Sequence, residues 1–385
     1  MTPAKDQPIP TNRRLHVLHV SVPTSGGVAT VATRYIRDQV ERGWNVTVAC
    51  PSRGDLGYAA REAGATVRWW RADAHESTLP GTVVRLNRIV REMSPDVVHL
   101  HSGRAGLAGR LVVRDRIPTV FQPHAWSFLG PRGGLRGASL RWERYAARAR
   151  WAGELICVSS AEHELGESLG IHAPATVVPN GVDLAEFRPA GDRDRIHARK
   201  LLGLDDVPIA LCVGALTVQK GQQDLLADWP EVRARVPEAQ LVLVGDGPDR
   251  GSLERLAAGM AGVSFVGART DVPLWLAAAD VVVVPSRWEG MALVPLEAMA
   301  CARSVVATDV NGVADSVPAD AGAIVPLDDP AALVGQLALR LEDPVLAGQE
   351  GWRGRSHVEA KHDATVSARE LARVYLRLVG ARRVR

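Results

Sequence analysis

The 385-residue sequence predicts an α/β protein with two doubly wound domains that face a cleft. Apolar runs of strand length alternate with segments of helical periodicity almost from end to end. Continuous apolar strands of this kind indicate parallel sheets covered by helices on both faces. The alternation pauses at the polar stretch 188–195 and then restarts, which predicts a second domain built like the first.

Six apolar runs predict the strands of the first domain, which we expect to span residues 1–187. The runs are 15–20, 44–50, 66–70, 96–101, 119–124 and 154–159. Between the first two, apolar residues recur at helical spacing from Val28 to Val40, and Gly43 ends that helix.

Six further runs predict the strands of a second domain over residues 188–362. They are 209–216, 239–245, 263–267, 280–286, 304–309 and 322–326. The remaining segment, 363–385, has the pattern of one amphipathic helix, which we expect to pack back on the first domain.

Composition and charge narrow the function classes. A net charge of +3 argues against nucleic-acid binding, and no apolar run is long enough to span a membrane. The N-terminus is polar and proline-rich, unlike a signal peptide. The four cysteines are scattered along the chain, which predicts buried free thiols and a cytoplasmic protein.

Two carboxylates stand eight residues apart in the apolar stretch that follows the predicted strand 280–286: Glu289 and Glu297. A helix beginning near Met291 would direct its free N–H groups toward the strand end, where a phosphate can bind. Eight helical residues span about 12 Å. The pattern therefore suits a phosphate-bridged ligand with a hydroxyl-bearing ring at either end. The alternative is a carboxylate favoured by the helix dipole and an unrelated surface glutamate.

Several polar or glycine positions follow predicted strands in the same way as Glu289. They are Gly26 and Gly27, Lys220, and Gly245 to Gly247. Ligands of open parallel sheets bind beyond the carboxyl ends of the strands, so we place these residues on the cleft side.

The segment PSRWEGMALVPLEAMACARSVVATDVNGVAD, residues 285–315, resembles the signature of retaining glycosyltransferases of family 4, which have two Rossmann-like domains in the GT-B arrangement. The similarity continues, in family order, through residues 25–32, 95–102, 177–183, 243–249 and 278–286. It implies a hexosyltransferase-like enzyme that uses a nucleotide diphosphate sugar, needs no cofactor, and acts in glycan, polysaccharide or glycolipid biosynthesis.

The resemblance implies roles for individual residues. Glu297 would bind the ribose hydroxyls, and Glu289 would hold a hydroxyl of the transferred sugar. His124 would touch the donor sugar at the reacting centre, whereas His99 and His101 are interpreted as structural. The remaining donor-binding residues would be Gly26, Gly27, Gly290, Met291, Ala292, Leu293 and Val294.

Lys220 matches the lysine with which the family neutralises the diphosphate, and a cation there would stabilise the leaving group. The sequence departs from the family pattern at Ala215, where the family has a second cation, arginine. Arg269, which we count among the donor-binding candidates, or Arg287 would have to supply that charge. Milder departures are Ala302, Ser304, Asn311 and Asp315.

The resemblance implies transfer with retained anomeric configuration, with attack on the face that the diphosphate leaves. The leaving phosphate would then help to deprotonate the acceptor, and no metal is expected. The Asp-x-Asp at 192–194 lies in a polar stretch that we interpret as a linker, and 244–251 is a poor dinucleotide fingerprint because Arg250 replaces its third glycine.

The expected partners are a nucleotide-sugar donor and an unidentified hydroxyl acceptor. A UDP-sugar is favoured as donor and GDP-mannose is the alternative. Within the basic segment 136–151, Arg141, Arg144 and Arg148 share one helical stripe. That stripe would suit peripheral contact with an anionic membrane at its inner face, and so a lipid-linked acceptor. The alternative is an ordinary surface helix.

Two other functions fit the same architecture. A sugar-nucleotide epimerase would form its product without an acceptor, which product analysis detects. A non-catalytic sugar-nucleotide-binding partner subunit, suggested by Ala215, would bind the nucleotide without transferring any sugar.

Overall fold

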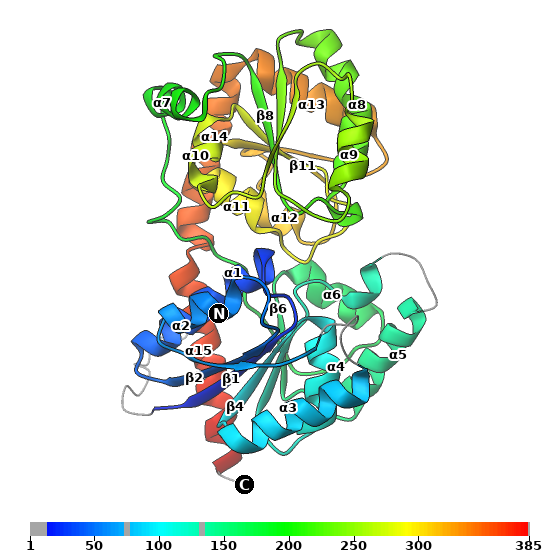
Figure 1. Ribbon diagram of the computed structural model, residues 1–385, viewed down its shortest axis with the longest axis vertical. Coiled ribbons are helices and arrows are strands. Elements are labelled where there is room, and N and C mark those ends of the chain that lie inside the picture. Colours follow the sequence, from blue (N-terminus) through cyan, green and yellow to red (C-terminus); the bar gives the residue numbers. More distant parts are fainter. Residues whose placement is uncertain (1–13, 73–77, 131–134, 384–385) are drawn as a thin grey trace, which may run out of the picture. The chain divides into compact units, whose positions relative to one another are not determined.

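A computed structural model describes residues 14–72, 78–130 and 135–383, so the polar N-terminal stretch lies outside the described residues. The chain forms two compact units. The first contains residues up to Cys157, His163–Val178 and Thr365–Arg385, and the second contains Val158–Glu162 and Pro179–Ala364. Each unit is a parallel sheet with helices on both faces, as predicted (Figure 1).

The first unit is built on a seven-stranded sheet of order β3-β2-β1-β4-β5-β6-β7. Its strands are β1 (His16–Ser21), β2 (Asn45–Cys50), β3 (Thr66–Trp69), β4 (Val97–His101), β5 (Thr119–Gln122), β6 (Glu154–Cys157) and β7 (Ala175–Val177). The helices are α1 (Gly26–Glu41), α2 (Leu56–Glu62), α3 (Leu79–Met93), α4 (Ser102–Val113), η1 (Ser127–Leu129), α5 (Leu135–Arg148), α6 (Ser160–Ser168, shared with the second unit) and α15 (Ala364–Arg383).

The two faces of this sheet have different surroundings. Leu18, Val20 and Leu100 join a core cluster to which α3 and α4 contribute. The alternate residues on β1 and β4 point to the other face because side chains alternate along a strand. That face carries His19, His99 and His101, all fully buried.

Helix α15 packs on the first unit although it is the last helix of the chain (Figure 1). The Tyr375 hydroxyl lies 2.5 Å from His99 Nδ1, and its ring approaches that of Trp44 with centroids 6.3 Å apart. The expected return of the C-terminal helix to the first domain is therefore observed.

The second unit is built on a six-stranded sheet of order β10-β9-β8-β11-β12-β13. Its strands are β8 (Ile209–Val213), β9 (Gln240–Val244), β10 (Val263–Gly267), β11 (Val281–Val284), β12 (Ser304–Thr308) and β13 (Gly322–Val325). The helices are α7 (Asp192–Leu202), η2 (Val218–Lys220), α8 (Gln222–Arg235), α9 (Arg250–Leu256), α10 (Val272–Ala278), α11 (Leu293–Ala300), α12 (Val313–Ser316), α13 (Pro330–Glu342) and α14 (Pro344–Lys361).

The run of four valines in β11 explains why this sheet is covered on both sides. Val281 and Val283 pack into a cluster with residues of α8, α9 and α13, whereas Val282 and Val284 pack into a second cluster with residues of α10, α11 and α14. A strand that is buried on both faces reads as a continuous apolar run rather than an alternating one.

The structure differs from the sequence prediction at three places. Strand β7 is additional to the predicted runs; it has only three residues, none of them fully buried, so it leaves no apolar pattern. The second unit takes up residues from Pro179 onward and also 158–162, because Asn180 and Ser159 hydrogen-bond to the carbonyls of Met291 and Gly290. The stretch 192–194 is not a linker but the first turn of α7, where the Asp194 carboxylate accepts from Gly191 N–H.

Helix α5 is fixed to the first unit by a buried ion pair. Arg110 of α4 donates two hydrogen bonds to Glu143 of α5, at 2.7 and 2.8 Å, and both side chains are 2% exposed. The Arg110 guanidinium also lies 4.0 Å from the ring centroid of Phe121. Removing either charge would leave the other buried and unpaired, so this pair holds α5 in one orientation.

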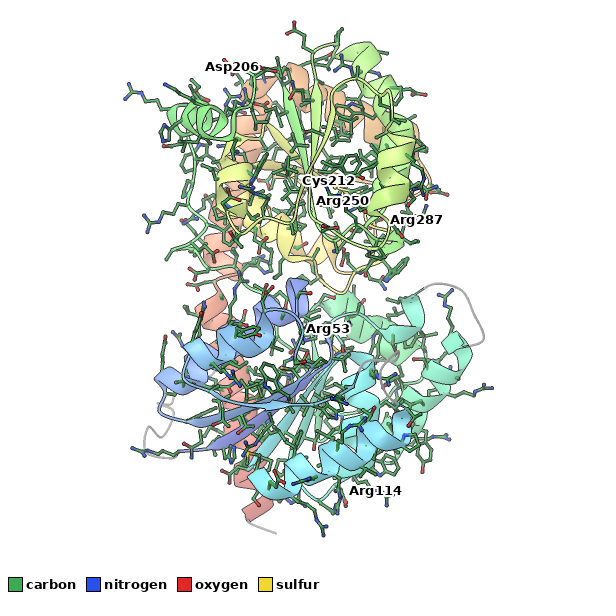
Figure 2. The ribbon with its side chains drawn as sticks, in the orientation of Figure 1. Arg53, Arg114, Asp206, Cys212, Arg250 and Arg287 are labelled. Atoms are coloured by element: carbon green, nitrogen blue, oxygen red, sulfur yellow. The ribbon has the colours of Figure 1, made fainter. Side chains whose placement is uncertain are left out.

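All four cysteines are buried and free, as the sequence predicts. Cys212 lies on β8 in the interior of the second unit (Figure 2). Among the described helices, none has the length and apolar character needed to cross a bilayer.

Candidate functional site

An ion pair between Lys220 and Glu289 forms the centre of the site in the second unit. Lys220 ends η2, which follows β8, and Glu289 lies in the loop after β11. Lys220 Nζ lies 2.5 Å from Glu289 Oε1, with the lysine side chain 24% exposed and the carboxylate 7%. Neighbouring strands of a parallel sheet bring these loops to one edge, as the sequence predicts for both residues.

Further hydrogen bonds join the two loops. Ser286 Oγ donates to Glu289 Oε1 at 2.7 Å. Gln219 Nε2 donates to Trp288 O at 3.0 Å, and Arg287 N–H donates to Gln219 O at 2.7 Å. Gln219 Nε2 also lies 3.4 Å from Glu289 Oε2, so Lys220 and Ser286 contact one carboxylate oxygen and Gln219 the other.

Two glycines allow neighbouring loops to approach the loop after β11 closely. Gly221 has φ +67°, and a Cβ there would lie 1.8 Å from Pro285 O. Gly312 has φ +78°, and a Cβ there would lie 1.7 Å from Gly290 O. A side chain at position 221 would clash with the Pro285 carbonyl, and one at position 312 would clash with the Gly290 carbonyl.

Helix α11 begins at Leu293, four residues after Glu289 and close to the start expected near Met291. Its N-cap residue, Ala292, offers no side-chain acceptor, and the first turn holds no acidic side chain. The first N–H groups of a helix lack intrahelical partners and carry partial positive charge. Met291 and Gly290 use their carbonyl oxygens to bind Asn180 and Ser159.

The remaining predicted residues of this loop, Ala292, Leu293 and Val294, form the start of the helix, and Glu297 follows one turn later. Glu297 is buried, with 9% of its surface exposed. A lysine, two carboxylates and a helix N-terminus thus occur on two adjoining segments, 214–221 and 285–300. This combination can bind an anion flanked by hydroxyl groups.

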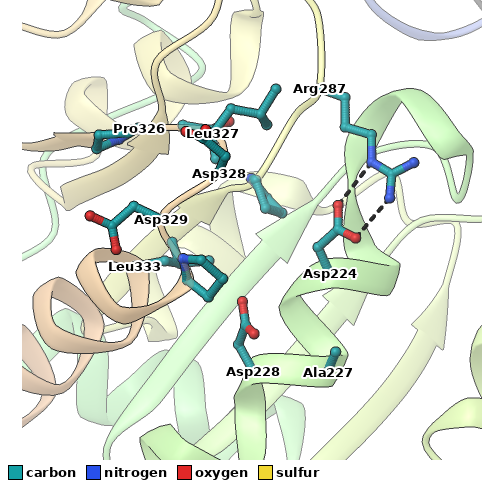
Figure 3. Close-up of a pocket in the computed structure, with 12 residues that line it drawn as sticks. Asp224, Ala227, Asp228, Arg287, Pro326, Leu327, Asp328, Asp329 and Leu333 are labelled. Atoms are coloured by element: carbon teal, nitrogen blue, oxygen red, sulfur yellow. Dashed lines mark hydrogen bonds and ion pairs between the residues drawn. The ribbon is translucent and has the colours of Figure 1, made fainter.

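The cations proposed to replace the missing arginine at 215 are engaged elsewhere. Arg287 donates two hydrogen bonds to Asp224 of α8, at 2.7 and 2.8 Å (Figure 3). Arg269 donates two hydrogen bonds to the Asp271 carboxylate, at 2.8 and 2.9 Å. Ala215 itself is exposed. Lys220 is therefore the cation that this structure directs toward Glu289.

A cavity of about 360 Å³ lies on the Asp224 side of Arg287 (Figure 3). Its lining includes Asp224, Asp228, Asp328 and Asp329, but not Lys220, Glu289 or Glu297. Burial, followed by the charges of Asp224 and Glu231, raises the pKa of Asp228. A wall with this excess of carboxylates repels a diphosphate, so the cavity is not the predicted phosphate site.

In the first unit, His124 follows β5 and has a strained backbone. Its φ is +61°, and Ser102, which follows β4, has φ +69°. Non-glycine residues in this region cost about 1–3 kcal/mol each and cluster at functional sites. His124 is partly exposed, unlike the histidines beneath it.

His124 is the half-buried end of a hydrogen-bonded chain whose other histidines, His101 and His19, are fully buried. His124 Nε2 lies 3.0 Å from His101 Nδ1, and His101 Nε2 lies 2.9 Å from His19 Nδ1. His19 Nε2 lies 2.9 Å from Gln39 Oε1 of α1. The interpretation of His101 as merely structural therefore misses a contact to His124. The His-x-His spacing on one strand face was the available signal, but the pairing of β1 with β4 could not be read from the sequence.

Burial keeps these imidazoles neutral. Desolvation lowers the pKa of His19 to about 4 and that of His124 to about 3. It also lowers the pKa values of His99 and His101 well below the usual range, helped by neighbouring imidazoles. At neutral pH each ring thus carries one N–H and one lone pair.

The other predicted residues of the first unit are Gly26 and Gly27, at the start of α1. Gly26 has φ +71°, which glycine adopts without strain. The side chain of the N-cap residue, Ser25, makes no capping hydrogen bond.

Ring nitrogens of His19, His99 and His101 lie within 4.8 Å of one another, which is the arrangement of a possible metal site. Both nitrogens of His19 and of His101 are, however, engaged in the hydrogen bonds given above. His99 lies outside that chain: its Nδ1 faces the Tyr375 hydroxyl, and its Nε2 is buried without a hydrogen-bond partner among the described residues.

Comparisons with known proteins cover both units. Residues 25–186 match the family model Glycosyltransferase Family 4, and residues 207–343 match the model Glycosyl transferases group 1. These two ranges include every predicted site residue.

Two curated relatives illustrate the sequence similarity. The chain is 30% identical over 312 residues to an alpha-D-kanosaminyltransferase of Streptomyces kanamyceticus, covering 76% of this chain and 80% of that protein. It is 34% identical over 218 residues to a GDP-mannose-dependent monoacylated alpha-(1-6)-phosphatidylinositol monomannoside mannosyltransferase of Corynebacterium glutamicum, covering 54% of this chain and 57% of that protein. The match thus spans less than two thirds of the mannosyltransferase.

A solved structure shows the same fold. The crystal structure of Anabaena HepE in complex with UDP-glucose superimposes with a TM-score of 0.81 at 20% identity, covering 94% of this chain and 99% of that one.

The neutral histidines predict a pH-dependent stability. The folded pKa of His19 lies below the unfolded value near 6.5, so the unfolded chain binds more protons between about pH 4 and 6.5. Stability should therefore be full above pH 6.5 and fall on acidification, by about 1 kcal/mol per such histidine at pH 5.5. Urea unfolding between pH 7 and 5.5 measures this loss.

The variant His19→Gln should flatten that dependence by about one proton. Glu162, whose pKa burial raises to about 8, acts in the opposite sense over this range. The difference between wild type and variant isolates the histidine, and parallel pH profiles for the two would contradict the assignment.

Proposed function

Because the chain belongs to glycosyltransferase family 4, we propose that it transfers a sugar from a nucleotide diphosphate sugar to an acceptor hydroxyl, with retention of anomeric configuration. The observation that carries this proposal is the Lys220–Glu289 pair beside the N-terminus of α11. Its parts match the groups of such a donor: a cation and backbone N–H groups for the diphosphate, and carboxylates for hydroxyls.

Leaving-group stabilisation is the main catalytic contribution that this site can make. Lys220 Nζ would exchange part of its contact with Glu289 for the diphosphate, on which charge develops as the glycosidic bond breaks. Glu289, released from that contact, would accept from a sugar hydroxyl while Ser286 keeps its carboxylate in place. Lys220 and the helix N-terminus then supply the positive charge without a metal ion or other cofactor.

The candidate site residues do not specify the base of the donor nucleotide. Glu297, one turn into α11, suits ribose hydroxyls and does not distinguish uridine from guanosine. The mannosyltransferase relative is GDP-mannose-dependent, whereas the HepE structure contains UDP-glucose. We propose a UDP-sugar as the first candidate and GDP-mannose as the second; a donor-hydrolysis assay with UDP-, GDP- and ADP-sugars separates them.

We also propose that the acceptor is lipid-linked and reached at an anionic membrane surface through α5. The side chains of Arg141, Arg144 and Arg148 are exposed on this helix, and Tyr145 between them is 55% exposed. Basic residues beside an exposed aromatic ring favour the interface of an anionic bilayer. The acceptor named for the Corynebacterium relative is a phosphatidylinositol monomannoside, a lipid.

Replacing either member of the ion pair should abolish transfer. For Lys220→Met and Glu289→Gln we expect kcat to fall about 100-fold or more, since both groups act on charge or hydroxyls at the reacting centre. The measurement is sugar transfer, or donor hydrolysis in EDTA, and the matched control is Lys200→Met, which removes an exposed lysine of α7. Near-normal turnover in either site variant would refute the roles assigned here.

Restoring the missing cation should tighten donor binding. In Ala215→Arg the new side chain starts from an exposed position on the loop that carries Lys220, so it can be accommodated. A charge-assisted hydrogen bond is worth roughly 1.5–3 kcal/mol, so the Kd for the nucleoside diphosphate should fall about 10-fold. Calorimetry measures the Kd, with Ala215→Gln as the uncharged control; equal affinity for the two variants contradicts a diphosphate at this loop.

Charge reversal on α5 should release the protein from membranes. We expect the wild type to float with vesicles that contain anionic lipid, and Arg141→Glu/Arg148→Glu to lose at least about 10-fold in partitioning, at ~1 kcal/mol per basic residue. The control Arg88→Glu/Arg91→Glu makes the same charge change on exposed positions of α3. Wild-type protein that floats with neither anionic nor neutral vesicles would remove the membrane from the proposal.

A further inference from the structure

The histidine chain ends at a single amide. Gln39 belongs to the last turn of α1 and is 2% exposed, and its Oε1 lies 2.9 Å from His19 Nε2.

This amide fixes the direction of every hydrogen bond in the chain. An amide oxygen only accepts, so His19 must carry its proton on Nε2 and leave Nδ1 as a lone pair. That lone pair accepts from His101 Nε2–H at 2.9 Å. His101 Nδ1 is then the lone pair that accepts from His124 Nε2–H at 3.0 Å.

We propose that Gln39 is a positioning residue which, through His19 and His101, fixes His124 in the Nε2–H tautomer, so that Nδ1 of His124 is a hydrogen-bond acceptor for a hydroxyl of the substrate. With the amide reversed, all three rings would reverse, and His124 would present an N–H where an acceptor is needed. The role of His124 rests on the proposed transferase function, whereas the direction of the chain rests on the contacts alone.

The surrounding structure makes this arrangement rigid. Gln39 is held from α1, and the histidines from β1, β4 and the end of β5. The φ of His124, +61°, is unfavourable for a free chain, so the surrounding structure holds its backbone in this conformation. In the hydrogen bonds given above for His19, His101 and His124, the partners are neutral imidazoles and an amide. The rings therefore exchange directional hydrogen bonds rather than ion pairs.

The first test measures the histidine tautomers directly and does not depend on enzyme activity. In protein labelled with ¹⁵N-histidine, long-range ¹H–¹⁵N spectra distinguish the protonated ring nitrogen from the unprotonated one, and single His→Gln variants assign the signals. We expect His19, His101 and His124 all to be protonated on Nε2 at pH 7.5. A protonated Nδ1 at His124, or stoichiometric zinc in the purified protein by elemental analysis, would overturn the proposal.

The second test replaces Gln39, the residue at the end of the hydrogen-bonded histidine chain. Gln39→Met removes the acceptor at nearly constant size, and we expect mixed tautomers at His124 and a fall of about 10-fold in kcat, as for partners that orient a functional imidazole. The Kd for the nucleoside diphosphate should stay unchanged, because Gln39 acts on His124 only. Gln39→Glu keeps an oxygen that accepts from His19, so it should restore the tautomer and most of kcat.

The matched control is Thr33→Val, which removes another buried polar group from α1 and should change neither tautomers nor kcat. Unchanged tautomers and kcat in Gln39→Met would overturn the proposal, as would an equal loss in Gln39→Glu. If Gln39→Met does not fold, the wild-type spectrum and the glutamate variant still decide it. A wild type with the expected tautomers but no transfer from any donor would refute the proposed function and leave the direction of the chain intact.

Discussion

The contact between Lys220 and Glu289 is the interaction on which the second unit's site depends. Each charge compensates the other in a setting where the carboxylate is almost fully buried, so neither stands alone without a ligand. The contact also ties the loop after β8 to the loop after β11, and Gly221 lets these two backbones approach closely. An anion that binds Lys220 can take over this compensation, which couples binding to the freeing of Glu289.

The two units supply different chemistry from equivalent places in their sheets. The second unit offers charge: a lysine, two carboxylates and a helix N-terminus. The first offers neutral imidazoles, because burial lowers the pKa values of His19 and His124 far below 7. Neutral groups give direction without adding charge, whereas charged groups give stronger interactions.

The departure at Ala215 has a defined electrostatic consequence. Arg287 and Arg269 are paired with Asp224 and Asp271, so their charge is already partly neutralised. Lys220 is then the principal cation facing Glu289, and the N–H groups of α11 gain in importance for any bound diphosphate.

The sequence by itself determined the fold class, most of the strands and the positions of Lys220 and Glu289 directly after strands, since continuous apolar runs and the polar residues that follow them are local patterns. It missed β7 and placed 192–194 outside a helix, because a three-residue edge strand and a polar helix leave little periodicity. Only the tertiary structure decided that Gln39, His19, His101 and His124 form one chain, and that Arg287 turns to Asp224. Those contacts depend on strand order and on helix packing, which bring together residues far apart in sequence.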